Sequence, residues 1–216
     1  MAGERPVEAV VFDVNGVLVD SMRLHVSLTR ELLAEAGVTL ADDQLAAYRG
    51  LGAADFFEAV RADAGADFDA EAMAERKLDA FAAAVDDVPA MDGAAATVRS
   101  LARGYAVGVA SNDGRRAVDA VLDRLGIAEV VGAVATIEDV AAGKPDPAVY
   151  ELAVDRLGVQ PPAAVAVDDS AVGVEAAQAA GLDVVGFNGS GDDPLAEAAT
   201  TVDQLRELPA AIDRLA

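Results

Sequence analysis

The sequence predicts an α/β fold, namely a doubly wound (Rossmann-like) parallel-sheet core with an inserted all-helical cap domain. Short Val-rich apolar runs recur along the chain, and each ends in turn or acidic residues. After Tyr105 these runs alternate with amphipathic stretches of roughly ten residues, which is the pattern of βαβ units and a parallel sheet. A long segment near the N-terminus breaks this alternation, because it is helix-like and contains no convincing strand.

The predicted strands fix the core. They cover residues 7–12, 105–110, 130–135, 163–167 and 183–187. Helix-like segments fill the stretch between the first two strands, at residues 30–36, 53–64 and 70–85. We therefore expect a core domain made of residues 1–20 and 90–216, with a helical cap domain over residues 21–89.

The predicted helices of the core end at glycines. Gly104, Gly126, Gly158 and Gly181 each follow an amphipathic segment rich in Ala, Leu and Arg, where a left-handed C-terminal cap is expected. Pro147 stands where the first turn of a helix accepts a proline.

Composition excludes several classes of function. The chain has no cysteine, which rules out disulfides, zinc–thiolate sites and a cysteine nucleophile. Its 38 acidic and 16 basic residues give a formal net charge of -22, so it should repel nucleic acid and anionic membranes. The acids are dispersed and only Lys77 and Lys144 are lysines, which is typical of halophilic proteins from organisms with molar internal salt. The N-terminus resembles neither a signal peptide nor a membrane span, so we expect a cytoplasmic protein.

Polar clusters directly follow the first, second and fourth predicted strands. They read Asp13-Val14-Asn15-Gly16, Ser111-Asn112-Asp113 and Asp168-Asp169-Ser170. Parallel sheets bind ligands at the carboxyl ends of their strands, so these clusters converge if the three strands are neighbours. Carboxylates gathered there need a cation, and an all-oxygen set suits Mg²⁺. Because acids are abundant in this chain, chance placement at strand ends is the alternative.

A lysine and a short polar turn complete the set. Lys144, in Gly143-Lys144-Pro145-Asp146-Pro147, precedes a predicted helix and supplies a fixed positive charge for an anion. Ser111 and Asn112 stand before the helix that begins near Arg115, where hydroxyl, amide and free N–H groups can hold a phosphate. Each alone also fits an ordinary surface loop or helix cap.

The four pieces together resemble the haloacid dehalogenase superfamily. Its pattern is an Asp-x-Asp-Gly box, a Ser or Thr after the second strand, a Lys ahead of a helix, and paired acids; here these stand as VVFDVNGVLVDS, VGVASND, GKPDP and VAVDDSAVGVEAA. The match covers essentially the whole chain. The segment from Asp20 to His25 and the segment from Tyr48 to Gly52 are similar to the hinge and the cap loop of the β-phosphoglucomutase and phosphoglycolate phosphatase branch.

The resemblance implies a Mg²⁺-dependent phosphoryl-transfer hydrolase, either a phosphatase or a phosphomutase-like enzyme, that acts on a small phosphorylated metabolite through an aspartyl phosphate at Asp13. The catalytic positions are Asp13, Asn15 and Lys144, and the phosphate-binding positions are Ser111, Asn112 and Lys144. Mg²⁺ is expected on Asp13, the Asn15 carbonyl, Asp168 and Asp169. Arg49 and His25 are candidate substrate contacts from the cap, although each also fits a surface or packing role. Oligomeric state is not predicted.

Asn15 departs from the family pattern, because phosphatases of this family carry a second Asp there as general acid and base. A carboxamide exchanges no proton at neutral pH, and losing such help costs about 10²–10⁴ in rate. Three interpretations follow: an enzyme whose leaving group needs no protonation, a protein that binds phosphorylated ligands without turnover, or a chain altered to trap a complex.

Two other reactions of the superfamily are alternatives to phosphoryl transfer. Haloacid dehalogenases also lack the second Asp, but their first motif reads Asp-x-Tyr and they need no Mg²⁺. Phosphonate cleavage needs a cap lysine, and Lys77, beside Glu75, Arg76 and Asp79, is predicted to lie on an exposed helix face. Both reactions therefore fit the sequence less well than phosphoryl transfer does.

Overall fold

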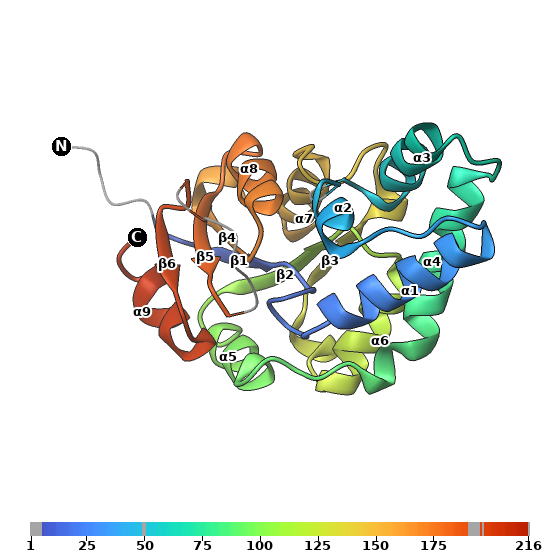
Figure 1. Cartoon of the computed structure of the whole chain (residues 1–216). Coiled ribbons are helices and arrows are strands. Elements are labelled where there is room, and N and C mark those ends of the chain that lie inside the picture. The colour runs from blue at the N-terminus through green and yellow to red at the C-terminus, as the bar shows by residue number, and fades with distance from the viewer. Residues whose placement is uncertain (1–5, 49–50, 190–194, 196, 216) are drawn as a thin grey trace.

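The computed structural model describes residues 6–48, 51–189, 195 and 197–215. Its centre is a six-stranded sheet in the order β3-β2-β1-β4-β5-β6, and every neighbouring pair is parallel (Figure 1). The strands are β1 (Ala9–Phe12), β2 (Ala106–Ser111), β3 (Ala133–Thr136), β4 (Ala164–Asp168), β5 (Asp183–Phe187) and β6 (Thr200–Val202). The predicted doubly wound fold is confirmed. The edge strand β6 was not predicted, because its three residues form no apolar run.

Helices cover both faces of the sheet, with α7 and α8 on one face and α5, α6 and α9 on the other (Figure 1). The α-helices are α1 (Met22–Glu35), α2 (Asp42–Ala46), α3 (Ala53–Ala64), α4 (Ala70–Ala84), α5 (Ala94–Leu101), α6 (Arg115–Leu125), α7 (Ala148–Leu157), α8 (Ala171–Ala179) and α9 (Leu208–Ile212). Single 3₁₀ turns lie at Val85–Asp87, Ala128–Val130, Ile137–Asp139, Pro161–Ala163 and Leu205–Glu207.

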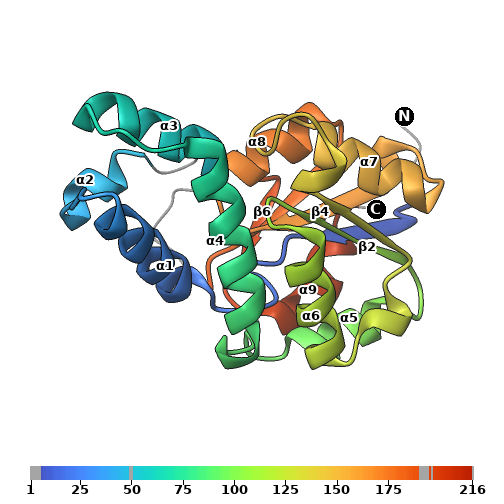
Figure 2. The same cartoon turned by 90° about the vertical axis from the view of Figure 1, so that its right-hand side faces the viewer.

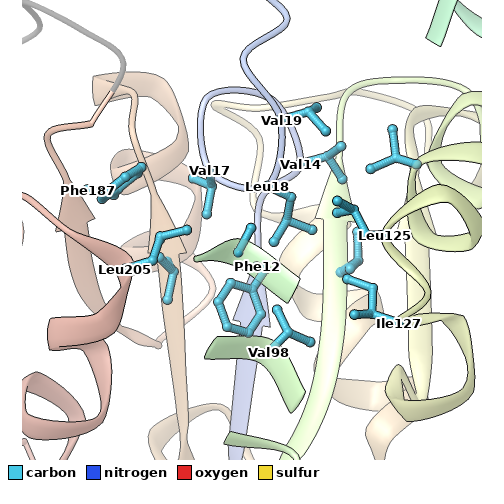
Figure 3. Close-up of a cluster of buried hydrophobic side chains, with 14 of the residues drawn as sticks. Phe12, Val14, Val17, Leu18, Val19, Val98, Leu125, Ile127, Phe187 and Leu205 are labelled. Carbon is cyan, nitrogen blue, oxygen red and sulfur yellow. The ribbon is translucent and has the colours of Figure 1, made fainter. Parts of the chain in front are cut away.

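Strand β1 shows how the sequence makes two cores. Side chains alternate across a strand, so Val10 and Phe12 face the layer of α5, α6 and α9, whereas Ala9 and Val11 face α7 and α8. All four are buried, as expected for a central parallel strand. Figure 3 shows Phe12 among buried side chains of the first layer, which include Leu18, Val98 and Leu205.

Three of the four predicted glycine stops have the left-handed backbone. Gly126 and Gly158 cap α6 and α7 with φ of 63° and 71°, and Gly181 follows the end of α8 with φ of 85°. The prediction for Gly104 was wrong, because its φ is not positive and α5 ends earlier, with Ala102 as its C-cap.

Helices α1 to α4 gather at one end of the molecule (Figures 1 and 2), where α1, α3 and α4 share an apolar cluster that includes Leu33, Phe57 and Met73. No strand occurs within the described part of this segment, residues 22–48 and 51–84. The two connections between the core and this helical segment lie side by side, because Asp20 N donates to Pro89 O at 2.8 Å. This geometry supports the proposed boundaries at 20/21 and 89/90, which stay a prediction.

The helical segment is fastened to the core by its last helix. α4 packs against α6, and Arg124 Nη1 donates to Val85 O at 2.7 Å just beyond the end of α4. Phe81 of α4 belongs to the buried cluster that contains Phe12. The described residues contain no helix that is both long and apolar enough to cross a membrane.

Candidate active site

The predicted polar clusters lie at one rim of the sheet. Strand β1 pairs with β2 on one side and β4 on the other, so the predicted adjacency of these three strands is confirmed. Asp13 follows β1 directly, while Ser111 and Asp168 are the last residues of β2 and β4. All three side chains are buried. The rim therefore combines two carboxylates and a hydroxyl, shielded from water.

Lys144 supplies the positive charge at this rim. Its Nζ lies 2.6 Å from Asp13 Oδ1 and 2.8 Å from Asp168 Oδ2. The side chain is only 4% exposed, so its charge is neutralised by these two carboxylates instead of by water. The loop before α7 thus places its lysine between the ends of β1 and β4.

The charges of this cluster perturb one another. Burial raises the pKa of Asp13 to about 8; Lys144 opposes the rise, and Asp168 and Asp169 add to it. Burial disfavours the Lys144 ammonium, but the two carboxylates beside it hold its pKa well above the usual value. The pKa of Asp168 is lowered in spite of burial, because Lys144 and neutral donors stabilise its carboxylate. The two buried carboxylates share one ammonium group, so Lys144 stabilises the ionised form of Asp168 while burial favours the protonated form of Asp13.

Tyr150 is a site residue that the sequence analysis missed. It lies in α7, is fully buried, and its hydroxyl donates to Asp168 Oδ2 at 2.6 Å. Lys144 Nζ lies 3.3 Å from the same hydroxyl and 4.7 Å from the ring centroid. Tyr150 therefore fixes both Asp168 and Lys144. The sequence shows only a tyrosine in a predicted helix six residues after the lysine, and that pattern alone indicates a residue packed in the core.

The start of α8 comes close to Asp168. Ser170 donates to Asp168 Oδ1 from both Oγ, at 2.8 Å, and its backbone N–H, at 3.0 Å. The same Oγ accepts from Gly173 N at 3.1 Å and so caps the helix. A Cβ at Gly173 would lie 2.0 Å from Asp168 Oδ2, so only glycine fits this approach.

Asp13, Asp168 and Asp169 form a group able to hold a cation. One carboxylate oxygen from each lies within 4.8 Å of the others. An all-oxygen set of this size suits Mg²⁺, which keeps several waters, and the pKa of Asp13 is raised first by burial and then by Asp168 and Asp169, both of which a bound cation would oppose. The residues present therefore fit the metal. The Asn15 carbonyl as a further ligand stays a prediction.

The predicted phosphate-binding residues occupy the second rim loop. Asn112 pairs with the backbone of Lys144, accepting from its N–H at 2.8 Å and donating to its carbonyl at 3.3 Å. Its amide thus holds the lysine loop against the end of β2. Ser111 Oγ accepts the backbone N–H of Asp113 at 3.1 Å. The roles of Ser111 and Asn112 toward phosphate stay predictions.

Asn15 is held from both ends of its carboxamide. Ser21 Oγ donates to Asn15 Oδ1 at 2.7 Å, and Asn15 Nδ2 donates to Asp113 Oδ2 at 2.6 Å. A hydroxyl donor on one side and a carboxylate acceptor on the other fix the orientation of the amide. Asp113, for which the sequence predicted no separate role, is buried directly after the predicted phosphate-binding residues Ser111 and Asn112.

The helical segment adds two basic side chains to this corner. The ring of His25 stacks on Phe81 at 4.3 Å, and its Nε2 lies 3.9 Å from Asp113 Oδ2. Burial lowers the pKa of His25, Asp113 opposes this, and Lys77 adds to it. The prediction that Lys77 lies on an exposed helix face was wrong, because α4 packs against α6 and Lys77 is half-buried. Burial lowers the pKa of Lys77, and the negative charge of Asp113 opposes that shift. His25 as a substrate contact stays a prediction, and Arg49 lies outside the described residues.

Comparison with known proteins places this geometry in a family context. A family profile described as haloacid dehalogenase-like hydrolase matches residues 7–181. Validoxylamine A 7'-phosphate phosphatase of Streptomyces hygroscopicus subsp. limoneus is 30% identical over 93% of this chain and 95% of its own. Fructose-1-phosphate phosphatase YqaB of Escherichia coli is 30% identical over 82% of this chain and 94% of its own. The structure of CbbY from Rhodobacter sphaeroides in complex with phosphate has a TM-score of 0.85 and 26% identity, covering 96% of this chain and 99% of that one.

Proposed function

The chain belongs to the haloacid dehalogenase-like hydrolases, and from this premise we propose that it is a Mg²⁺-dependent phosphatase of small phosphorylated sugars that uses Asp13 as its nucleophile. The family match confirms the superfamily that the motifs resemble. The branch is confirmed as well, because a phosphoglycolate phosphatase is among the relatives and the fold is that of β-phosphoglucomutases. The observation that carries the proposal is the buried contact between Lys144 and Asp13 at the metal-binding rim.

A buried carboxylate nucleophile needs positive charge around the group it attacks. Lys144 contributes a permanent charge within 2.6 Å of Asp13. Asp13, Asp168 and Asp169 would hold Mg²⁺, which supplies neutralisation of the phosphoryl oxygens when bound. With its pKa raised to about 8, Asp13 is largely protonated at neutral pH until further positive charge is added. Phosphoryl transfer therefore depends on the whole rim and not on Asp13 alone.

The remaining residues orient this machinery. Tyr150 and Ser170 together donate three hydrogen bonds to Asp168, and Asn112 fixes the loop of Lys144. Burial excludes water, which strengthens each charge interaction at the rim. Asp13 would attack phosphorus to form an aspartyl phosphate, and water would then release inorganic phosphate.

The relatives favour a sugar phosphate as substrate. Two phosphatases that match over most of both chains act, by name, on validoxylamine A 7'-phosphate and on fructose 1-phosphate. The chain itself is strongly acidic, which disfavours substrates with several anionic groups away from the rim. A neutral, hydroxyl-rich leaving group fits both observations.

A substrate panel tests the proposal. Phosphorylated sugars, phosphoglycolate, acyl phosphates and 2-haloacids would be assayed in molar KCl, with Mg²⁺ or with EDTA, for wild type and Asp13→Asn. We expect Mg²⁺-dependent phosphate release from sugar phosphates, lost in Asp13→Asn. Halide release without Mg²⁺ would replace the proposal with dehalogenation. Tight phosphate-ester binding without turnover in any arm would replace it with ligand binding alone.

A further inference from the structure

The carboxyl group that position 15 lacks is present one hydrogen bond away. Asn15 Nδ2 donates to Asp113 Oδ2 at 2.6 Å, and Asn15 has its other end fixed by Ser21. The two side chains come from different strand ends, the loops after β1 and β2. The amide therefore holds a carboxylate in a defined place at the rim.

Asp113 also has the right neighbours for chemistry at a phosphoryl group. Its backbone N–H donates to Ser111 Oγ at 3.1 Å, so it begins the turn directly beyond the predicted phosphate-binding residue. On its other side lie His25 of α1 and, within electrostatic reach, Lys77 of α4. Asp113 thus stands between the phosphoryl site and the helical segment, where the leaving group of a substrate would lie.

An unpartnered atom marks the same corner. His25 Nε2 is buried and has no hydrogen-bond partner among the described residues. Its separation of 3.9 Å from Asp113 Oδ2 is too long for a direct hydrogen bond, and a ligand oxygen at hydrogen-bond distance from both atoms would lie to one side of the line that joins them. A sugar hydroxyl or ester oxygen would satisfy both.

We propose that Asp113 is a catalytic residue that performs the proton transfers for which Asn15 has no carboxyl, an inference that rests on the proposed phosphatase function. As Asp13 attacks phosphorus and the bond from phosphorus to the leaving oxygen breaks, the Asp113 carboxylic acid gives its proton to that oxygen. The resulting carboxylate then takes a proton from water as the water oxygen attacks phosphorus. The bond between phosphorus and Asp13 breaks, and phosphate leaves with Asp113 protonated again.

Exchanging the two side chains tests this role. Four proteins would be compared: wild type, Asp113→Asn, the double variant Asn15→Asp/Asp113→Asn, and Asp123→Asn as the same change at an exposed acid of α6. Asp113→Asn should lower turnover of a sugar phosphate by at least about 10². The double variant keeps one amide and one carboxyl in the pair and should recover at least about tenfold. Asp123→Asn should match wild type.

Acetyl phosphate separates proton transfer from a structural role, because its leaving carboxylate needs little protonation. Asp113→Asn should still form the phosphoenzyme from acetyl phosphate and should keep it longer than wild type, since activation of water is lost. Turnover within threefold of wild type, no recovery in the double variant, or loss of phosphoenzyme formation in Asp113→Asn would each overturn the assignment. If wild type itself forms neither phosphoenzyme nor phosphate, the proposed function fails instead.

Discussion

Lys144 Nζ lies 2.6 Å from Asp13 Oδ1 in the buried part of the rim. Because this ammonium faces two buried carboxylates, removing it leaves uncompensated charge. Lys144→Met, which keeps much of the aliphatic stem, should lower sugar-phosphate turnover by at least about 10². Without metal it should also lower the free energy of unfolding by about 3–5 kcal/mol. Denaturation in EDTA and in Mg²⁺ checks this, and Mg²⁺ should stabilise the variant more than it stabilises wild type. Equal stabilisation of the two proteins by Mg²⁺ would contradict the idea that Lys144 neutralises the same carboxylates as the metal.

The metal site makes a prediction about Asp169. Replacing one of three carboxylates with a neutral amide should raise the Kd for Mg²⁺ at least about tenfold, so calorimetry on Asp169→Asn should show the weaker binding. Asp183→Asn is the matched control, since Asp183 is an exposed acid at the opposite end of a parallel strand. An unchanged affinity in Asp169→Asn would remove Asp169 from the metal ligands.

His25 is the only histidine in the chain, so its titration can be followed by NMR without assignment. Burial disfavours the imidazolium, and the pKa should lie below 6.5 although Asp113 opposes the shift. A lowered folded-state pKa contributes stability above the unfolded value, and that stability is lost as pH falls through the folded pKa. Wild type should therefore lose stability below pH 6.5 relative to His25→Gln. A measured pKa above 6.5 would show that Asp113 outweighs burial.

The acid excess leads to a prediction about salt. Many of the ion pairs join exposed side chains, such as Arg61 with Glu58 and Arg76 with Glu35, and these contribute little stability. Repulsion among the other surface acids should then govern stability. The melting temperature should rise as KCl increases from about 0.1 M to about 1 M and beyond, because the screening length falls from about 10 Å to about 3 Å. A flat or falling melting temperature would reject salt adaptation.

Much of the fold could be predicted because buried parallel strands are continuous apolar runs. Five strands follow from Val-rich runs, and the adjacency of β1, β2 and β4 brings together the motifs that follow them. Strand β6 was not predicted because Thr200 and Thr201, at the edge of the sheet, form no apolar run. The prediction of a left-handed cap at Gly104 was wrong because a glycine after a helix does not itself require positive φ.

The site was predictable only where chemistry follows directly from position in the chain. Asp13, Lys144 and Asp168 stand in motifs, and the structure brings them together. Tyr150 and Asp113 were missed because their roles depend on contacts across the fold, between α7 and β4 and between two strand-end loops. Such contacts leave no periodic signal in one sequence.

Phosphorylation of Asp13 is the central claim, and trapping the intermediate tests it most directly. The protein would be mixed with acetyl phosphate or a sugar phosphate in Mg²⁺, quenched in acid and reduced with borohydride, which converts an aspartyl phosphate to homoserine. Peptide mass mapping should then find homoserine at position 13, in amounts that fall in EDTA. Phosphate release with no modification at Asp13, or modification at another carboxylate, would contradict the account.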